Sequence, residues 1–273
     1  MNGVPLSRII EMADELFPFS LAEPWDNSGL QIGDPDKLVQ RLAVSLDPTP
    51  HTLAFAQTMQ CQLLITHHPV LIQPVSRIVK GDYVGRIVMA AATSGVDVLA
   101  LHTNLDAAPG GLNDALAHML GLEEVVTPES APCARLGHLP EPLPIEALAE
   151  KVRDDLHVDR VTIVHSSDRS HTVQSVFCVS GSGMSYLREA LNMRADVIVT
   201  GDVRYHSAVE ARDMGIAVID AGHYGLEQHA VELLCSTFKR TFAQRGWTLD
   251  VFPCNSETSP FCDTMGSFRR ETK

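Results

Sequence analysis

Apolar residues recur at helical spacing near the start of the chain and afterwards gather in short runs typical of strands. Residues 5–17 carry one apolar stripe that predicts a helix ending before Pro18. The β-branched runs 41–47, 61–68 and 96–102 predict strands, and residues 50–60 and 83–94 predict helices between them. This alternation is typical of parallel strands joined by crossover helices. A further helix is expected over 113–120.

A second series of the same kind follows a proline-rich stretch over 122–143, which has no periodicity and marks a boundary or connecting segment. It comprises a helix near 144–156, strands over 160–165, 173–180, 196–200 and 216–220, and a long helix from about 225 to 245. We therefore predict a first domain over 1–125, a second over 126–252, and a loosely packed tail over 253–273. The last helix could also pack back against the first domain.

The chemistry-bearing residues stand where predicted strands end. One cluster is Thr66-His67-His68-Pro69, where Pro69 turns the backbone after the strand. The other two, His102 with Asp106 and His223 with Glu227, each pair a histidine with an acid four residues later. A duplicated unit would leave this repeated spacing, although two such pairs among twelve histidines can also arise by chance. Carboxyl ends of strands are where open α/β sheets place their sites.

Imidazole and carboxylate groups are common ligands of divalent metals. Each cluster also has a simpler interpretation: histidines that cap a strand end, an Asp106 that caps a turn, or a Glu227 that favours a helix N-terminus. Together they offer five or six nitrogen and oxygen ligands, more than one tetrahedral zinc requires. Two divalent metals that share a bridging carboxylate are the natural interpretation. The glycine-rich stretch 179–186 could cradle a phosphate, but a tight turn is the simpler explanation.

Composition narrows the function classes. The 273 residues are 45% hydrophobic, enough for real cores, and the net charge of −13 makes nucleic acid an unlikely partner. The most apolar region, 84–101, is interrupted by Arg86 and Asp97, so no membrane-spanning helix is expected. The N-terminus does not resemble a signal peptide and the six cysteines form no CxxC pair, which favours a cytoplasmic protein with free thiols.

Several motifs, in their order along the chain, resemble those of the Nif-three-like (NGG-interacting-factor-three-like) family. They are WDNSGLQ at 25–31, LDPT at 46–49, LITHHPV at 64–70, HTNLD at 102–106, VTGD at 199–202 and AGHYGLE at 221–227. The resemblance covers residues 5–252. Members of this family are often described as GTP cyclohydrolase I type 2 homologues.

The resemblance implies an α/β fold of two related α/β domains with mostly parallel sheets and a metal site between them at the strand carboxyl ends. It further implies a homo-hexamer and two divalent metal ions per chain, whether zinc, iron, manganese or magnesium. The implied ligands are His67, His68, Asp106, His223 and Glu227. His102 matches a neighbouring family histidine that we expect to support the ligands, although it could itself reach a metal.

Two function classes follow. The first is a metal-dependent hydrolase of the GTP cyclohydrolase I type 2-like kind, acting on a nucleotide or phosphoester as its small-molecule substrate. The alternative is a non-catalytic metal-binding or metal-delivery protein. A general base would discriminate them, and His102, Asp47 and Asp202 are the candidates.

Overall fold

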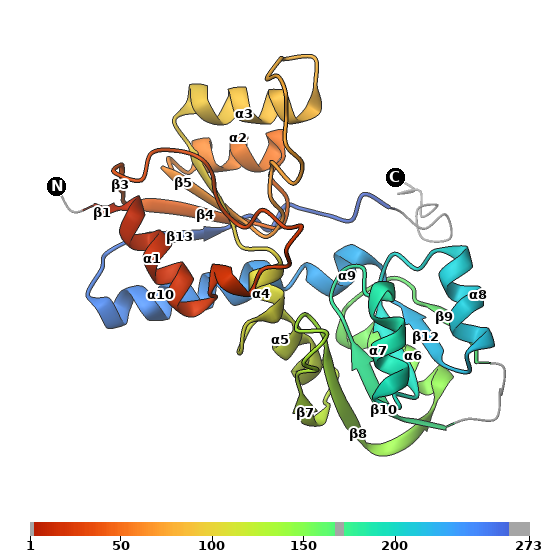
Figure 1. Ribbon diagram of the computed structural model, residues 1–273. Helices are drawn as coiled ribbons and strands as arrows, with labels where there is room; N and C mark the ends of the chain where they lie inside the picture. Colours follow the sequence, from red (N-terminus) through yellow and green to blue (C-terminus); the bar gives the residue numbers. More distant parts are fainter. Residues whose placement is uncertain (1–2, 167–171, 262–273) are drawn as a thin grey trace, which may run out of the picture. The chain divides into compact units, whose positions relative to one another are not determined.

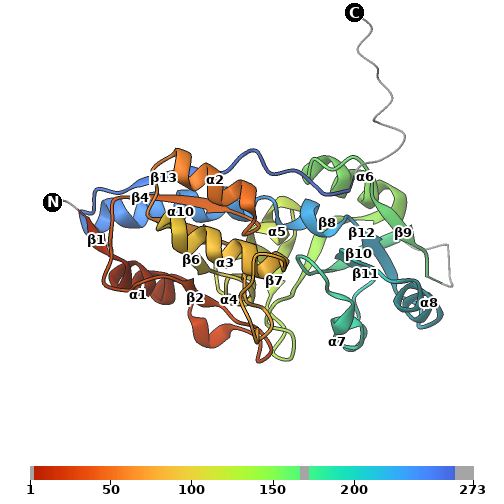
Figure 2. The same ribbon diagram turned by 90° about the horizontal axis from the view of Figure 1, so that it is seen from above.

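The computed structural model describes residues 3–166 and 172–261, which form two compact units (Figures 1 and 2). The first unit comprises the described residues up to Ala115 together with Gln228–Glu257. The second comprises the described residues of Leu116–Glu227 and those from Thr258 onward. The helix expected over 113–120 is α5 (Leu112–Met119), which passes from the first unit into the second.

The first unit is built on a five-stranded sheet with the order β13-β4-β5-β6-β2. Strands β4, β5 and β6 run parallel, β13 joins them parallel at one edge, and β2 pairs antiparallel with β6 at the other. The strands of this sheet are β2 (Gly29–Ile32), β4 (Arg41–Ser45), β5 (Leu63–Thr66), β6 (Asp97–Ala100) and β13 (Asp250–Pro253). Strands β1 (Val4–Pro5) and β3 (Leu38–Val39) pair with each other in a separate two-stranded sheet. The helices of the first unit are α1 (Leu6–Leu16), the 3-10 turn η1 (Phe19–Leu21), α2 (Pro50–Thr58), α3 (Tyr83–Ser94), α4 (Thr103–Ala107) and α10 (Ala230–Arg245).

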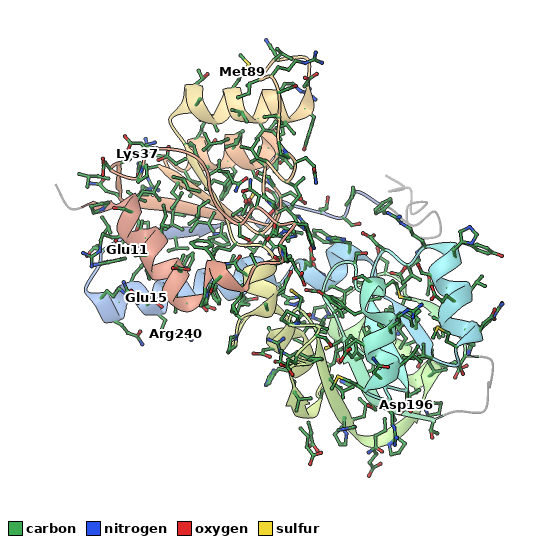
Figure 3. All side chains as sticks on the ribbon, in the orientation of Figure 1. Glu11, Glu15, Lys37, Met89, Asp196 and Arg240 are labelled. Carbon is green, nitrogen blue, oxygen red and sulfur yellow. The ribbon has the colours of Figure 1, made fainter. Side chains whose placement is uncertain are left out.

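Helices cover both faces of this sheet. Helices α2 and α3 lie side by side over one face, and α1 and α10 lie on the other (Figure 1). Alternate strand residues serve the two faces: Ala43, Leu64 and Val98 pack with α2 and α3, and the fully buried Leu42, Leu63 and Leu99 point the other way. Charged side chains such as Glu11, Glu15 and Arg240 project from the outer sides of α1 and α10 (Figure 3).

The second unit has a six-stranded sheet with the order β7-β8-β10-β11-β12-β9. Strands β10, β11 and β12 are parallel, whereas β8 and β9 pair antiparallel at their two sides. The strands are β7 (Glu123–Val126), β8 (Arg135–Pro144), β9 (Thr162–Val164), β10 (Thr172–Cys178), β11 (Val197–Thr200) and β12 (Ala217–Asp220). The helices are α6 (Ile145–Asp155), the 3-10 turn η2 (Met184–Tyr186), α7 (Leu187–Asn192), α8 (Tyr205–Asp213) and α9 (His223–Glu227).

Adjacent residues of the central strands again point to opposite faces of the sheet, and each face has its own hydrophobic core. Val197 and Val199 pack with α5 and α6, whereas Ile198, between them, packs with α7 and α8. Asp196, labelled in Figure 3, accepts hydrogen bonds from the backbone N–H groups of Gln174 and Ser175, which fixes the start of β11 beside β10.

The two units share the order of their central elements, which confirms the prediction of two related α/β domains. The first contains α1, β2, β4, α2, β5, α3 and β6 in chain order, and the second contains α6, β9, β10, α7, β11, α8 and β12. In each unit the first of these strands pairs antiparallel with the last. In each, a five-residue helix, α4 or α9, follows the last strand closely.

The observed units differ from the contiguous division at residues 125 and 252. Helix α10 and strand β13 return to the first unit because β13 adds to its sheet, with Asp250 opposite Arg41 and Pro253 opposite Val44. The start of the expected tail is also ordered, since Cys254 is buried and donates its backbone N–H to Val44. Residues 262–273 of that tail lie outside the described residues.

Three departures concern individual elements. Part of the proline-rich connection forms strands β7 and β8, and the loop after residue 102 contains α4. The long helix expected from about 225 is divided into α9 and α10.

Within residues 3–166 and 172–261, none of the helices combines the length and apolar character needed to cross a bilayer.

Candidate metal centre

The carboxyl ends of β5 and β6 bring three histidines of the first unit together. His67 and His68 follow β5, and His102 follows β6. Their ring centroids form a triangle with sides of 4.9 Å (His67–His68), 5.2 Å (His67–His102) and 5.4 Å (His68–His102). One ligand atom from each ring lies within 4.8 Å of the others, so the three side chains could hold a metal ion.

Each of these rings is oriented by an oxygen acceptor at Nδ1. His67 donates to the carbonyl oxygen of Leu101 (2.9 Å), His68 to the Asp47 carboxylate (2.8 Å), and His102 to the Asp26 carboxylate (2.7 Å). With Nδ1 protonated, Nε2 carries the lone pair of the neutral ring. Acceptors of this kind fix the tautomer of metal-binding histidines and increase their basicity.

Asp26 is held by more than the histidine. Its carboxylate also accepts hydrogen bonds from the Ser28 hydroxyl (2.7 Å) and from the hydroxyl and N–H of Thr103 (2.6 and 3.1 Å). Burial by itself raises the pKa of Asp26, but the hydrogen bond and charge interaction with His102, helped by Thr103 and Ser28, leave it well below the ordinary 3.8. The carboxylate is therefore an anion that anchors His102.

Asp106 lies on α4, the short helix that follows His102. Its Oδ1 is 3.9 Å from Nε2 of His67, and its side chain is nearly buried. Helix α4 begins because the His102 carbonyl accepts the N–H groups of Leu105 and Asp106. The Asn113 amide donates to the Asp106 carbonyl (3.3 Å), so the backbone of Asp106 is held from the next helix.

The second unit carries the remaining predicted ligands on α9. Nε2 of His223 lies 2.9 Å from Oε2 of Glu227, one helical turn further on. Nδ1 of His223 donates to the Asp202 carboxylate (2.8 Å), which follows β11. His223 is thus oriented by an aspartate in the same way as His68 and His102. The Glu227 carboxylate is buried, with 3% of its surface exposed.

Glycines allow the close packing around this pair. Gly181 has φ +60°, and a Cβ at this position would lie 2.4 Å from Oε1 of Glu227 and 3.3 Å from the His223 ring. A Cβ at Gly201 would lie 2.7 Å from the backbone nitrogen of His223. The Gly183 N–H donates to the Thr200 hydroxyl (2.8 Å). The stretch 179–186 is therefore a tight turn that packs against the side chains of α9.

A segment distant in sequence fixes the loop that carries Asp47. The Glu257 carboxylate accepts the backbone N–H groups of Leu46 (2.8 Å) and Asp47 (3.0 Å). Burial raises the pKa of Glu257, an effect that these two hydrogen bonds partly offset. Through Asp47, this contact supports the orientation of His68.

The structure arranges the predicted ligands within their own units: His67, His68 and Asp106 around the ends of β5 and β6, and His223 with Glu227 on α9. His102 lies as close to His67 and His68 as a ligand would. Asp47 and Asp202, two candidate general bases, each orient a histidine. Asp26 was not among the predicted site residues; it lies 76 positions before His102, and no local spacing connects the two.

The sequence matches the family model of Duf34/NIF3 (NGG1p interacting factor 3) over residues 4–260. The chain belongs to the NIF3 family. It is similar to the "GTP cyclohydrolase 1 type 2 homolog" of Streptococcus pneumoniae, with 31% identity over 93% of this chain and 98% of the relative. It is 32% identical to the "GTP cyclohydrolase 1 type 2" of Helicobacter pylori over 82% and 87% of the two chains.

Two solved structures have a similar fold. The Staphylococcus aureus hypothetical protein SA1388 superposes with a TM-score of 0.88 over 96% of this chain and 99% of its own, at 24% identity. Reduced HcgD from Methanocaldococcus jannaschii superposes with a TM-score of 0.77 over 93% and 98% of the two chains, at 27% identity.

Proposed function

We propose that this chain binds two divalent metal ions through His67, His68, Asp106, His223 and Glu227, and that it is a metal-dependent hydrolase of a nucleotide or phosphoester. The observation that carries the proposal is the repeated orientation of the histidines. His67, His68, His102 and His223 each have Nδ1 bonded to an oxygen acceptor, which leaves Nε2 as the metal-binding nitrogen. The names of the relatives make GTP the first substrate to test.

The donor set fits hard or borderline divalent ions such as zinc, iron, manganese or magnesium. Cys61 and Cys235 are poorly suited to this role, because burial raises the pKa of each thiol to about 11. When bound, such ions act as Lewis acids that polarise a substrate oxygen and activate water near neutral pH. The chain itself contributes fixed ligands, with Asp26, Asp47 and Asp202 holding the imidazole protons at Nδ1.

A metal-delivery protein is the second candidate, and one observation favours it. The carboxylates expected to serve as general bases, Asp47 and Asp202, are already engaged with histidine Nδ1 atoms. A carrier needs oriented ligands but no base.

Metal analysis followed by turnover assays tests both functions. Metal-reconstituted protein should hold about two ions per chain, and His68→Ala should lower that occupancy sharply. His118→Ala, which replaces an exposed histidine, should leave the metal occupancy unchanged. GTP and a panel of nucleotides and phosphoesters are then incubated with metal-replete protein. Loss of turnover in Asp106→Asn supports the hydrolase. Absence of turnover on every substrate, with rapid metal transfer to a chelator, supports the carrier.

We further propose that the protein is a cytoplasmic homo-hexamer that binds no nucleic acid. The five described cysteines are all unbridged and buried, as suits a reducing compartment. Light scattering should report a mass about six times the 29.8 kDa of one chain. A monomer at micromolar concentration would contradict the proposed assembly.

A further inference from the structure

An exposed tryptophan stands beside the three-histidine cluster. Trp25 has 59% of its surface exposed, and its ring meets the His102 ring edge to face, with centroids 5.9 Å apart. The other tryptophan of the chain, Trp247, instead packs against Phe242 and lies under the Arg245 guanidinium. A large aromatic side chain gains much free energy from burial. Its exposure next to candidate ligands therefore suggests a surface that a ligand covers.

The loop that carries Trp25 is firmly held. Asp26, the next residue, donates its N–H to the Glu23 carbonyl, and its carboxylate accepts the hydrogen bonds from His102, Ser28 and Thr103 described above. The backbone beside Trp25 is thus held next to His102 before any ligand arrives. Such preorganisation reduces the entropy lost on binding.

Apolar residues of a second loop adjoin this one. The Asn27 side-chain amide donates to the Leu71 carbonyl (2.7 Å), and the Leu71 N–H donates to the Gln31 side chain (3.1 Å). Leu71 is followed by Ile72 and Val75, which are 37% and 43% exposed. The loops after η1 and after β5 therefore lie side by side, and both present apolar surface within a few residues of the histidines.

We propose that Trp25 is the stacking platform for an aromatic heterocycle of the substrate, which makes the substrate class a nucleoside or nucleotide rather than a simple phosphoester. The inference rests on the proposed function and narrows its substrate. Aromatic side chains stack on any nucleobase because every base has a π-face. The chain's net charge of −13 gives an anionic ligand little general attraction. Affinity for a nucleotide must then come from the metals at its phosphates and from stacking at its base.

The two tryptophans allow a direct binding test. Trp247→Phe leaves Trp25 as the only tryptophan, and Trp25→Phe leaves only Trp247. Metal-replete forms of both variants are titrated with a non-hydrolysable GTP analogue and, separately, with inorganic tripolyphosphate, which has no base. We expect the analogue to quench the fluorescence of Trp25 in the first variant in a saturable manner. Tripolyphosphate should not quench the fluorescence of Trp25. The fluorescence of Trp247 in the second variant should not respond to either probe.

Affinity provides the second readout. Trp25→Ala should weaken binding of the analogue by about 5- to 150-fold, the range of one base–aromatic stack. Binding of tripolyphosphate should not change, and Trp25→Phe should retain most of the affinity. Metal content is measured in each variant, because Asp26 anchors His102 from the adjacent position.

The outcomes separate this inference from the proposed function. If the analogue binds no more tightly than tripolyphosphate and Trp25→Ala changes neither, stacking is overturned while a phosphoester hydrolase stands. If Trp25→Ala alters the oligomeric state but not the affinity, Trp25 is an assembly contact and the inference is wrong. If neither probe binds and no nucleotide is turned over, the hydrolase proposal and the stacking inference both fail.

Discussion

At the scale of single residues, the site depends on carboxylates that serve histidines. Asp26 anchors His102, Asp47 anchors His68 and Asp202 anchors His223. Such partners set which imidazole nitrogen faces a metal, and their loss typically lowers metal affinity 10- to 100-fold. Replacement of an anchor is therefore as informative as replacement of a ligand.

Asp26→Asn should weaken both the fold and the metal site. Each carboxylate oxygen of Asp26 accepts hydrogen bonds, so the NH₂ group of the introduced amide would oppose a donor in either orientation. We expect a loss of about 1–3 kcal/mol in unfolding free energy and a fall of about 10- to 100-fold in metal affinity. Urea denaturation and metal titration measure these effects, with the exposed Asp159→Asn as control.

The pH dependence of this loss has a definite sign. Because the pKa of Asp26 lies below its ordinary 3.8 in the folded chain, its stabilising contribution is complete above that value and disappears as pH falls below it. The stability gap between wild type and Asp26→Asn should thus be constant from neutral pH to about pH 4. A gap that already falls between neutral pH and about pH 4 would contradict the assignment of this contribution to the Asp26 carboxylate.

Gly181→Ala isolates the close contact at Glu227. The positive φ of Gly181 makes an alanine there cost about 1–2 kcal/mol, and the added Cβ would also collide with Oε1 of Glu227. Gly215 has φ +84° with open space around its Cα, so Gly215→Ala carries only the backbone cost. We expect both variants to lose stability in urea, and only Gly181→Ala to lose metal affinity. Equal metal affinity in the two variants would mean that Glu227 adjusts without consequence.

At the scale of elements, the segment after β13 crosses back to the end of β4. Glu257→Ala removes the acceptor of the Leu46 and Asp47 N–H groups, and we expect a loss of about 1–2 kcal/mol. Metal affinity should fall too, because Asp47 orients His68. The neighbouring Ser256→Ala deletes the exposed contact with His51 and a long contact with the Cys254 thiol (3.6 Å), but it keeps the acceptor of the Leu46 and Asp47 N–H groups. It should cost less than about 0.5 kcal/mol. Chemical denaturation and metal titration of the two variants compare these effects, and similar values in both would refute the role given to Glu257.

Elements with strong periodicity were predictable, and those that depend on distant partners were not. Helix α1 ends before Pro18 as expected, and β4, β5, β6, β11 and β12 fall within the predicted runs. Strand β8 was not predicted, because it contains Pro140, Pro142 and Pro144 and proline normally argues against a strand. β13 is a strand only because β4 offers it a parallel edge more than 200 positions earlier.

The same contrast applies to the site. Histidines and acids directly after buried strands could be found from sequence, because strand ends define one edge of a sheet. Their supports could not: Asp26 and Glu257 reach the site from 76 and 210 positions away. Asp47 and Asp202 were noticed as candidate bases, but only the fold shows that each accepts a histidine N–H.

At the scale of the whole molecule, metal binding should stabilise the folded chain. A ligand that binds only the native state adds RT ln(1 + [L]/Kd), about 2.7 kcal/mol when the free metal is at 100 times Kd. Both units carry proposed ligands, His68 in the first and Glu227 in the second. Chelator treatment should therefore lower the midpoint of thermal unfolding, and readdition of zinc or manganese should restore it.

The variants decide whether this stabilisation comes from the proposed ligands. In His68→Ala and in Glu227→Gln the difference between chelated and metal-replete protein should shrink, because each removes one ligand of the set. His118→Ala replaces an exposed histidine of α5 and should keep the full difference. Differential scanning calorimetry of the chelated and metal-replete forms gives the measurement. A full metal-dependent shift in His68→Ala would place the stabilising metal elsewhere and contradict the ligand assignment.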